Sequence, residues 1–281
     1  MFVLPALVLF SVVVTYPVAQ TLLKGFYRWD GIGTPVFTGI TNFVRLFKNP
    51  DFITALVNGG ICVLVLAVYQ IGVGSVLALT LLDRRLRLRT AFKVAYFIPV
   101  VLSITVVCQL WIAIYNYDHG LLNALFKSFG MSYRQTFLVD RHTSILAVTF
   151  VNAWQYVGIH LVFVYAAAQT IPEHLFEAAR MDGAPPWKMH YYITLPLLAQ
   201  TYKFCLTLAV TGGLQIFGHV FIMTNGGPGT STYTLTLLMY KLAFLTNQFG
   251  YGSSVAAFLI VECLAATILI NRFVARQRYT F

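Results

Sequence analysis

Four polar side chains recur at helical spacing within one apolar stretch of the chain. Asn152, Gln155, Tyr156 and His160 fall at i, i+3, i+4 and i+8, which places an amide pair, a phenol and an imidazole on one stripe of a helix. Such a stripe could line a watery cavity that binds sugar hydroxyls, with aromatic faces such as Trp154 or Tyr156 stacking on a ring. It could equally tie helices together by hydrogen bonds that contribute about 1 kcal/mol each, and the residues alone leave both interpretations open.

Three more polar residues interrupt apolar segments. Gln109 and Gln215 are weaker candidates for the same cavity wall. Glu262 is near the middle of the last apolar segment, where an unpaired charge costs at least about 2.5 kcal/mol. It should therefore face other helices or be protonated. A helix-to-helix hydrogen bond is the favoured role for Glu262, with a pathway or coupling role as the alternative.

Motifs of catalysis are absent from the sequence. There is no GxxxxGK[ST] phosphate loop, and the cluster Gly226-Gly227-Pro228-Gly229 lacks the lysine that such a loop needs. HExxH, GxSxG and paired intramembrane aspartates are missing too. The six histidines are scattered and the four cysteines are isolated in apolar segments. The chain is thus predicted to be no enzyme and to hold neither a metal nor a cofactor.

The elements that carry these residues must cross a membrane. Of 281 residues, 58% are hydrophobic and 10% charged, whereas a soluble domain has about 25% charged residues. A spanning helix needs about 20 mostly apolar residues. Six windows qualify, and they predict one all-α membrane domain over residues 1–281, a bundle of six transmembrane helices at about 3–23, 57–82, 92–114, 144–168, 199–222 and 252–271.

The first window is too long for a signal-peptide core and has no basic segment ahead of it, so it is interpreted as a retained span. Its abrupt apolar start leaves open a short basic leader ahead of residue 1.

Basic residues predict the orientation of the bundle. The formal charge of +10 is spread over the breaks between apolar runs and forms no basic patch with interleaved aromatics, so no nucleic-acid partner is expected. Charges packed close to span ends are typical of the cytoplasmic side. This places both termini inside, together with Arg84, Arg85, Arg87, Arg89, Lys93, Arg180, Lys188, Lys203, Arg272, Arg276 and Arg278. Residues 117–141 and 226–248 are then external.

The joint between the fourth and fifth windows, about residues 169–196, predicts a helix, a turn and a second helix. Pro172 suits a first helical turn and Glu173 its positive end. Gly183 can adopt the left-handed conformation that stops a helix, and Pro186 can begin the next one. From these residues alone, the joint is either an amphipathic segment resting on the membrane or a docking surface.

Spaced residues of this joint resemble a known signature. Glu177-Ala178-Ala179, then Gly183, and then Ile193, Leu195 and Pro196 match the cytoplasmic signature of permease subunits of binding-protein-dependent ABC importers. Only the pair Pro185-Pro186 departs from the small or polar pair that is common there. A second stretch, Thr224-Asn225-Gly226-Gly227-Pro228 with Gly252-Ser253-Ser254, is similar to carbohydrate-type permeases, in particular to the larger maltose permease subunit.

The resemblance implies a type I importer fold and a set of partners. Members of this family work in the bacterial cytoplasmic (inner) membrane, where two homologous permease subunits are surrounded by membrane lipid. Two ATPase subunits bind ATP and Mg, and an external solute-binding protein delivers the solute. It also implies that the ATPase is coupled through Glu177, Ala178, Ala179, Asp182, Gly183, Ile193, Leu195 and Pro196. A secondary carrier or channel for a small polar solute is the alternative. Similar chains carry maltodextrins, other oligosaccharides, monosaccharides or glycerol phosphate, so the solute stays open.

Overall fold

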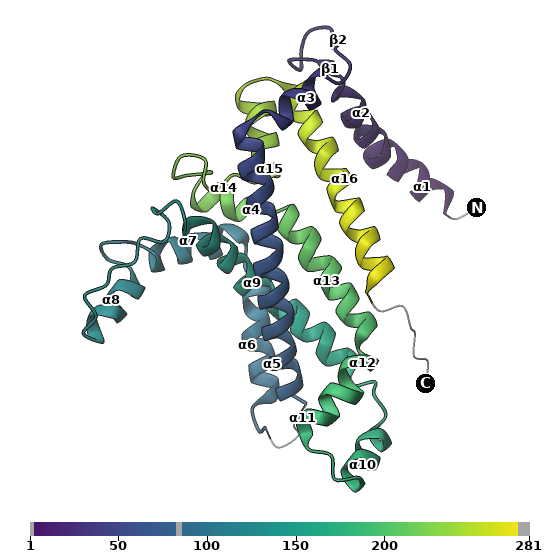
Figure 1. Cartoon of the computed structure of the whole chain (residues 1–281), viewed down its shortest axis with the longest axis vertical. Coiled ribbons are helices and arrows are strands. Elements are labelled where there is room, and N and C mark those ends of the chain that lie inside the picture. The colour runs from purple at the N-terminus through teal and green to yellow at the C-terminus, as the bar shows by residue number, and fades with distance from the viewer. Residues whose placement is uncertain (1–2, 83–85, 275–281) are drawn as a thin grey trace.

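The computed structural model describes residues 3–82 and 86–274, and these form a bundle of long apolar helices (Figure 1). Five helices are long and apolar enough to cross a membrane, or six if one bent pair counts as a span. This confirms the predicted membrane bundle. The basic residues Arg84, Arg85, Arg276 and Arg278, used above to orient it, lie outside the described residues.

Four spans agree with the predicted windows to within a few residues at most ends. The first consists of α1 (Leu4–Phe10), the π-helical turn η1 (Ser11–Thr15) and α2 (Tyr16–Lys24). The others are α9 (Ser144–Ala168), α13 (Ala199–Leu214) with α14 (Gly218–Met223), and α16 (Phe249–Phe273). The 25-residue length of α9 amounts to roughly 37 Å at 1.5 Å per residue, enough to span the hydrocarbon core.

The second span begins earlier than predicted. It consists of α4 (Pro50–Leu66), the π-helical segment η2 (Ala67–Val73) and α5 (Gly74–Thr80). Its start is fixed by Asn49, whose side chain accepts a hydrogen bond from the Asp51 N–H at 2.9 Å, with Pro50 in the first turn. This N-cap and the following proline are a strong start signal, which hydropathy alone did not register.

The third predicted span, 92–114, was wrong as one continuous helix. It consists of α6 (Arg89–Val101) and α7 (Ile104–Ile114), which meet at 100°. Pro99 lies inside α6 and cannot donate a backbone hydrogen bond, Leu102 is extended, and the Ser103 hydroxyl accepts from the Val106 N–H to begin α7. Proline followed by an N-cap serine therefore breaks the span at residues 102–103.

A second break separates α13 from α14 at residues 215–217. The carbonyl of Ile216 is taken up by two hydroxyls, from Thr234 at 2.9 Å and from Thr236 at 2.7 Å. These threonines lie at the start of α15 (Leu235–Tyr240), which continues into η4 (Lys241–Leu245), an apolar element too short to span.

The remaining elements lie at the ends of the bundle. At one end, β1 (Tyr27–Arg28) pairs antiparallel with β2 (Val36–Phe37), followed by α3 (Thr41–Phe47); this small hairpin was not predicted. α8 (Leu121–Ser128) follows α7. At the opposite end lie α10 (Glu173–Met181), α11 (Pro186–Met189), η3 (His190–Thr194) and α12 (Leu195–Leu197) (Figure 1).

Helix α9 is the centre of the fold, with most of its residues buried and with contacts to α4, α5, α6, α13 and α14. The first span is the opposite case, because no residue of Leu4–Lys24 is buried. Its α2 part contacts α16, and α1 leaves the bundle at an angle (Figure 1).

Candidate functional site: a coupling joint and an intramembrane cavity

The joint folds as a helix, a glycine turn and a second helix, as the residues predicted. Gly183 has φ of +73°, the left-handed conformation in which a side chain is strained. Its N–H donates to the Arg180 carbonyl at 3.0 Å, and the Ala184 N–H donates to the Ala179 carbonyl at 2.9 Å. These two bonds form a Schellman motif, which ends α10 and turns the chain toward α11.

The two sides of α10 differ in burial. Leu175 and Phe176 pack against a buried apolar cluster that includes Leu161, Val164 and Leu198. The other side is open: Glu177, Ala178, Asp182 and Gly183 are exposed, Ala179 is half-buried, and Met181 has 89% of its surface free. Further along, Ile193 is half-buried, while Leu195 and Pro196 are exposed. Apolar surface thus faces outward beside the signature residues.

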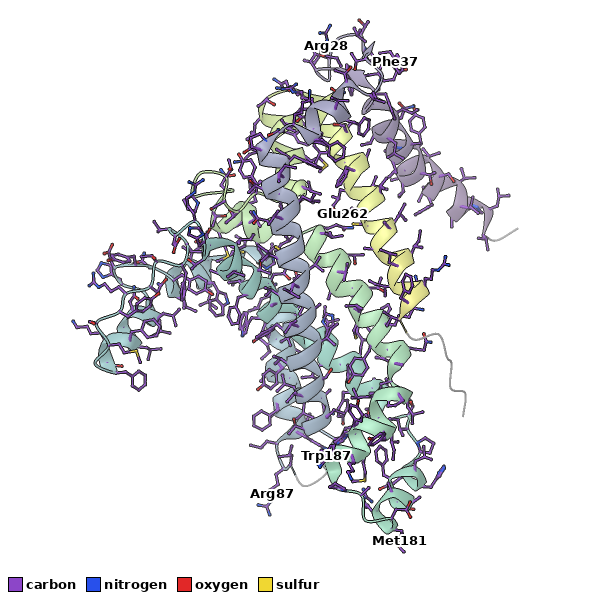
Figure 2. All side chains as sticks on the ribbon, in the orientation of Figure 1. Arg28, Phe37, Arg87, Met181, Trp187 and Glu262 are labelled. Carbon is purple, nitrogen blue, oxygen red and sulfur yellow. The ribbon has the colours of Figure 1, made fainter. Side chains whose placement is uncertain are left out.

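Arg87 lies at the same end of the molecule as Met181 and Trp187, whereas Arg28 and Phe37 mark the other end (Figure 2). A hollow of about 860 Å³ lies between the joint and the nearby span ends, and Arg89, Arg180 and His190 are among the residues that line it. The basic residues near the joint are therefore gathered at one end of the bundle.

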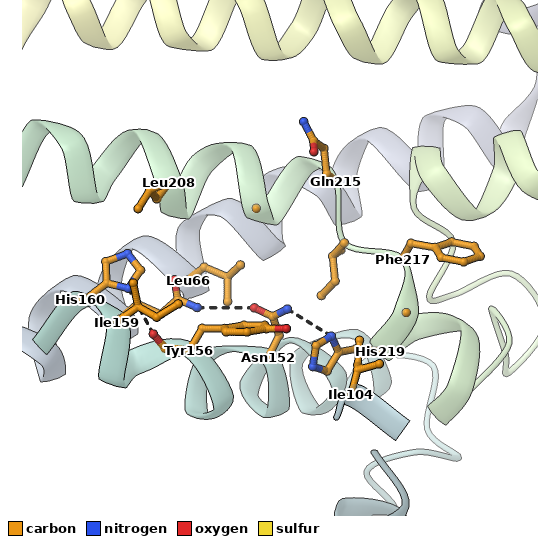
Figure 3. A pocket seen from close by; sticks show the side chains of 14 residues that line it. Leu66, Ile104, Asn152, Tyr156, Ile159, His160, Leu208, Gln215, Phe217 and His219 are labelled. Carbon is orange, nitrogen blue, oxygen red and sulfur yellow. Dashed lines mark hydrogen bonds between the residues drawn. The ribbon is translucent and has the colours of Figure 1, made fainter. Parts of the chain in front are cut away.

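A partly open cavity of about 380 Å³ lies between α9 and α13 (Figure 3). Four predicted residues line it: Asn152, Tyr156 and His160 on α9, and Gln215 at the end of α13. Gln215 points toward α16 (Figure 3), where its amide nitrogen lies 3.5 Å from the Cys263 sulfur. Among the described residues the lining contains no lysine, arginine, aspartate or glutamate.

A chain of hydrogen bonds follows one wall of this cavity. Gln70 on η2 donates to the Asn152 side-chain oxygen at 3.5 Å, a long bond, and Asn152 donates to His219 Nδ1 at 3.2 Å. His219 Nε2 is 2.8 Å from the Gln155 side-chain oxygen. The Tyr156 hydroxyl forms no hydrogen bond with any described residue, and Tyr156 lines the cavity. The amides and the phenol of this lining are groups that hydrogen-bond to hydroxylated solutes, whereas the ring of Phe217 stacks on Phe221.

Three of the predicted path residues do not line the cavity. Gln155 is buried behind the wall, with 1% of its surface exposed. Gln109 is exposed on α7. Glu262, at mid-height of α16 (Figure 2), is half-buried, and one of its carboxyl oxygens is buried without a partner among the described residues.

Two lining residues, Gln70 and His219, were not predicted. Each lies inside a mostly apolar window, and only the folded chain brings it to Asn152. The polar character of both positions within predicted spans was the one signal available.

Comparison with known proteins decides the family. Residues 70–279 match the family described as binding-protein-dependent transport system inner membrane component. The chain belongs to this family. It is thus the permease subunit of an ABC importer, and a secondary carrier or channel no longer needs to be considered.

Individual relatives span nearly the whole permease. A probable ABC transporter permease of Bacillus subtilis is 33% identical over 97% of this chain and 94% of its own. The lactose transport system permease LacF of Rhizobium radiobacter is 31% identical over 99% and 94%. In structure, a bacterial ABC transporter that imports the acidic polysaccharide alginate superposes with a TM-score of 0.84 at 22% identity, over 96% of this chain and 92% of that one; at that identity it establishes the fold.

Proposed function

We propose that this permease is one of two transmembrane subunits in a bacterial importer of a neutral carbohydrate. A second homologous permease, two ATPase subunits that bind ATP and Mg, and an external solute-binding protein complete the transporter in the cytoplasmic membrane. Both termini and the joint at residues 169–196 face the cytoplasm. The family membership and the lactose permease as a relative support this proposal.

The observation that carries the coupling role is the exposed face of α10. Glu177, Ala178 and Met181 project from a short helix that is fixed from behind by Leu175 and Phe176 and stopped by the Gly183 turn. A rigid element held in this way transmits force without bending. Closure of the ATPase pair would move α10, and with it α9 and α13, to which the joint is connected at either end.

The composition of the cavity supports a neutral, hydroxyl-rich solute. Gln70, Asn152, Tyr156 and Gln215 offer amide and phenol groups, and the ring of Tyr156 can stack on a sugar face. An anionic solute in a low-dielectric span would require a cation, and the described residues that line the cavity include no lysine or arginine.

The exposed surface of the first span supports the proposal of a second permease subunit. Val12 and Val13 each keep more than half of their surface free although they lie mid-span. Membrane helices associate through packed surfaces, and α1 projects away from its own bundle (Figure 1). We assign this surface to the second permease.

A three-variant series at Gly183 tests the coupling role. A Cβ at this position would meet no atom within 4 Å, so substitution acts through backbone strain and charge alone. Gly183→Asn tolerates the left-handed conformation and should keep ATPase binding close to wild type. Gly183→Asp has the same shape but places a negative charge at the docking surface. It should weaken ATPase binding about tenfold or more and lower solute-stimulated ATP hydrolysis in parallel. Gly183→Ala, strained but uncharged, should fall between them.

These effects are measured with the assembled transporter in lipid nanodiscs, with membrane insertion of the permease as the control. Wild-type ATPase affinity and turnover in Gly183→Asp would show that the joint does not couple the two subunits.

The solute class is tested separately by uptake assays with the matching binding protein. These compare neutral oligosaccharides with oligosaccharides that contain uronate.

A further inference from the structure

The two helix breaks of this permease lie against each other. The first, at residues 102–103, separates α6 from α7, and the second, at 215–217, separates α13 from α14. Ile104, the first residue of α7, is so close to Gly218, the first residue of α14, that a Cβ on the glycine would be 2.5 Å from the Ile104 Cδ1. Helices α7 and α14 are therefore packed together directly beyond their breaks.

One side chain bonds to both broken spans. Gln155 on α9 donates to the Leu102 carbonyl at 3.2 Å, inside the first break, and its side-chain oxygen is 2.8 Å from His219 Nε2 on α14. All three residues belong to different spans. Losing Gln155 or His219 would leave a buried polar group without a partner, which is costly in a medium that excludes water.

The hydrogen-bond partners of His219 determine which of its ring nitrogens carries the hydrogen. The Asn152 amide nitrogen can only donate, so His219 Nδ1 accepts, and the Gln155 oxygen can only accept, so His219 Nε2 donates. A neutral imidazole with its hydrogen on Nε2 satisfies both. His219 thereby joins Gln155, which holds the breaks, to Asn152, which faces the cavity.

The packed pair α7 and α14 lies at the side of the bundle, in the half farther from the coupling joint (Figure 1). Ile104, Phe217, Gly218 and His219 line the cavity next to this pair. A movement of α7 and α14 would therefore open or close the cavity toward the side opposite the joint, which is the external side in the proposed orientation.

We propose that α7 and α14 form the external gate of the cavity and that the Gln155–His219 hydrogen bond is its latch, with His219 as a positioning residue that links the latch to Asn152. This inference rests on the proposed function, since the same cavity binds the solute. A solute hydroxyl that accepts the Asn152 hydrogen now bonded to His219 Nδ1 replaces that bond, loosens the latch and keeps the gate open. The latch forms again when the solute leaves toward the cytoplasm.

A native thiol reports on the gate. Cys108 is fully buried on α7, in a cluster with Val148 and Val151 of α9 and Val220 of α14. In a chain with Cys62, Cys205 and Cys263 replaced by alanine, its rate of modification by a small polar methanethiosulfonate measures how often α7 and α14 separate from α9. The complete transporter is used in nanodiscs, where both faces are accessible, without solute or ATP.

His219→Leu keeps the volume of the ring and removes both hydrogen bonds, so Cys108 should react about tenfold faster or more. Gln155→Leu should have at least the same effect, because it also removes the bond to the Leu102 carbonyl. The effects of the two substitutions should not add in the double variant, because Gln155 and His219 share one hydrogen bond. His219→Gln retains a donor and an acceptor and should restore a rate within about twofold of wild type. His160→Leu is the matched control, a second cavity histidine whose ring nitrogens lie near the carbonyls of Tyr156 and Cys205 and not near either break; it should leave the Cys108 rate unchanged.

Co-purification with the ATPase shows that each variant is folded. A wild-type Cys108 rate in assembled His219→Leu and Gln155→Leu would overturn the latch, as would equal acceleration by His160→Leu. If His219→Leu does not assemble, Gln155→Leu alone decides. Because labelling needs no solute, a transporter that fails to import carbohydrate yet shows these rates contradicts the proposed function and leaves the latch in place.

Discussion

Gly158, at the middle of α9, lies against the backbone of Phe97 on α6: a Cβ on Gly158 would stand 3.1 Å from the Phe97 Cα, and closer still to the Tyr96 carbonyl oxygen. Because these obstacles are backbone atoms, no side-chain rotation can relieve them. This contact sets how closely α6, and with it the first break, approaches the central helix.

Replacing Gly158 with alanine should therefore destabilise the permease, by about 1–3 kcal/mol for an overpacked site. Gly60→Ala in α4 is the matched control, since a Cβ there meets nothing within 4 Å and alanine favours the helix. Denaturation of the purified subunit in mixed micelles measures both. Equal stability of the two variants would mean that α6 shifts freely.

The proposed orientation predicts which ends of the bundle react with an impermeant thiol reagent. Ser132, in the loop after α8, is exposed, and Arg87 lies at the end that holds the joint (Figure 2). On a background without the four native cysteines, Ser132→Cys should be labelled in intact cells and Arg87→Cys only after permeabilisation. The reverse pattern would invert the topology.

The Tyr156 hydroxyl should contribute directly to solute transport. It lines the cavity and has no bond to another described residue, so Tyr156→Phe removes one hydrogen bond to solute and leaves packing intact. The solute concentration for half-maximal uptake should rise about three- to tenfold, while ATPase binding is unchanged. Gln109→Ala, on the exposed side of α7, is expected to transport like wild type. Equal losses in both variants, with poor assembly, would assign the polar stripe to helix packing instead.

The first span should contact the second permease. A photoreactive residue at Val13, 62% exposed, should cross-link to that subunit, whereas one at Val76 of α5, 67% exposed, should react only with lipid. Mass spectrometry of the cross-linked bands identifies the product. A cross-link from Val76 with none from Val13 would place the partner on the opposite side of the bundle.

The elements of this fold that could be predicted from sequence depend on local signals. The length of the apolar segments predicted the spans, and Pro172 and Gly183 predicted the two helices of the joint. A helix start and a left-handed helix stop depend on only a few neighbouring residues. The spacing of Asn152, Tyr156 and His160 likewise predicted one stripe, and all three line one cavity.

The remaining features depend on distant partners. Pro99 is compatible with a kinked span as well as with a 100° break, and the observed break includes the Leu102 carbonyl bonded to Gln155, 53 positions away. Gln155 shares the predicted stripe but is buried behind the cavity wall. There its side-chain oxygen accepts a hydrogen bond from His219. His219 and Gln70 carried no periodic pattern of their own, so only the packing of α14 and η2 against α9 could reveal them.

The backbone carbonyls of Leu102 and Ile216, held by Gln155 and by the pair Thr234 and Thr236, have a kinetic consequence. A carbonyl inside hydrocarbon cannot be left without a donor, at a cost of several kcal/mol, so these bonds must be exchanged when the helices move. Water is the donor small enough to enter the breaks. If α7 and α14 separate as proposed, hydration of the two carbonyls would precede each opening. A concentrated osmolyte too large to enter the cavity, which lowers water activity, should then slow import without binding to the solute or the ATPase.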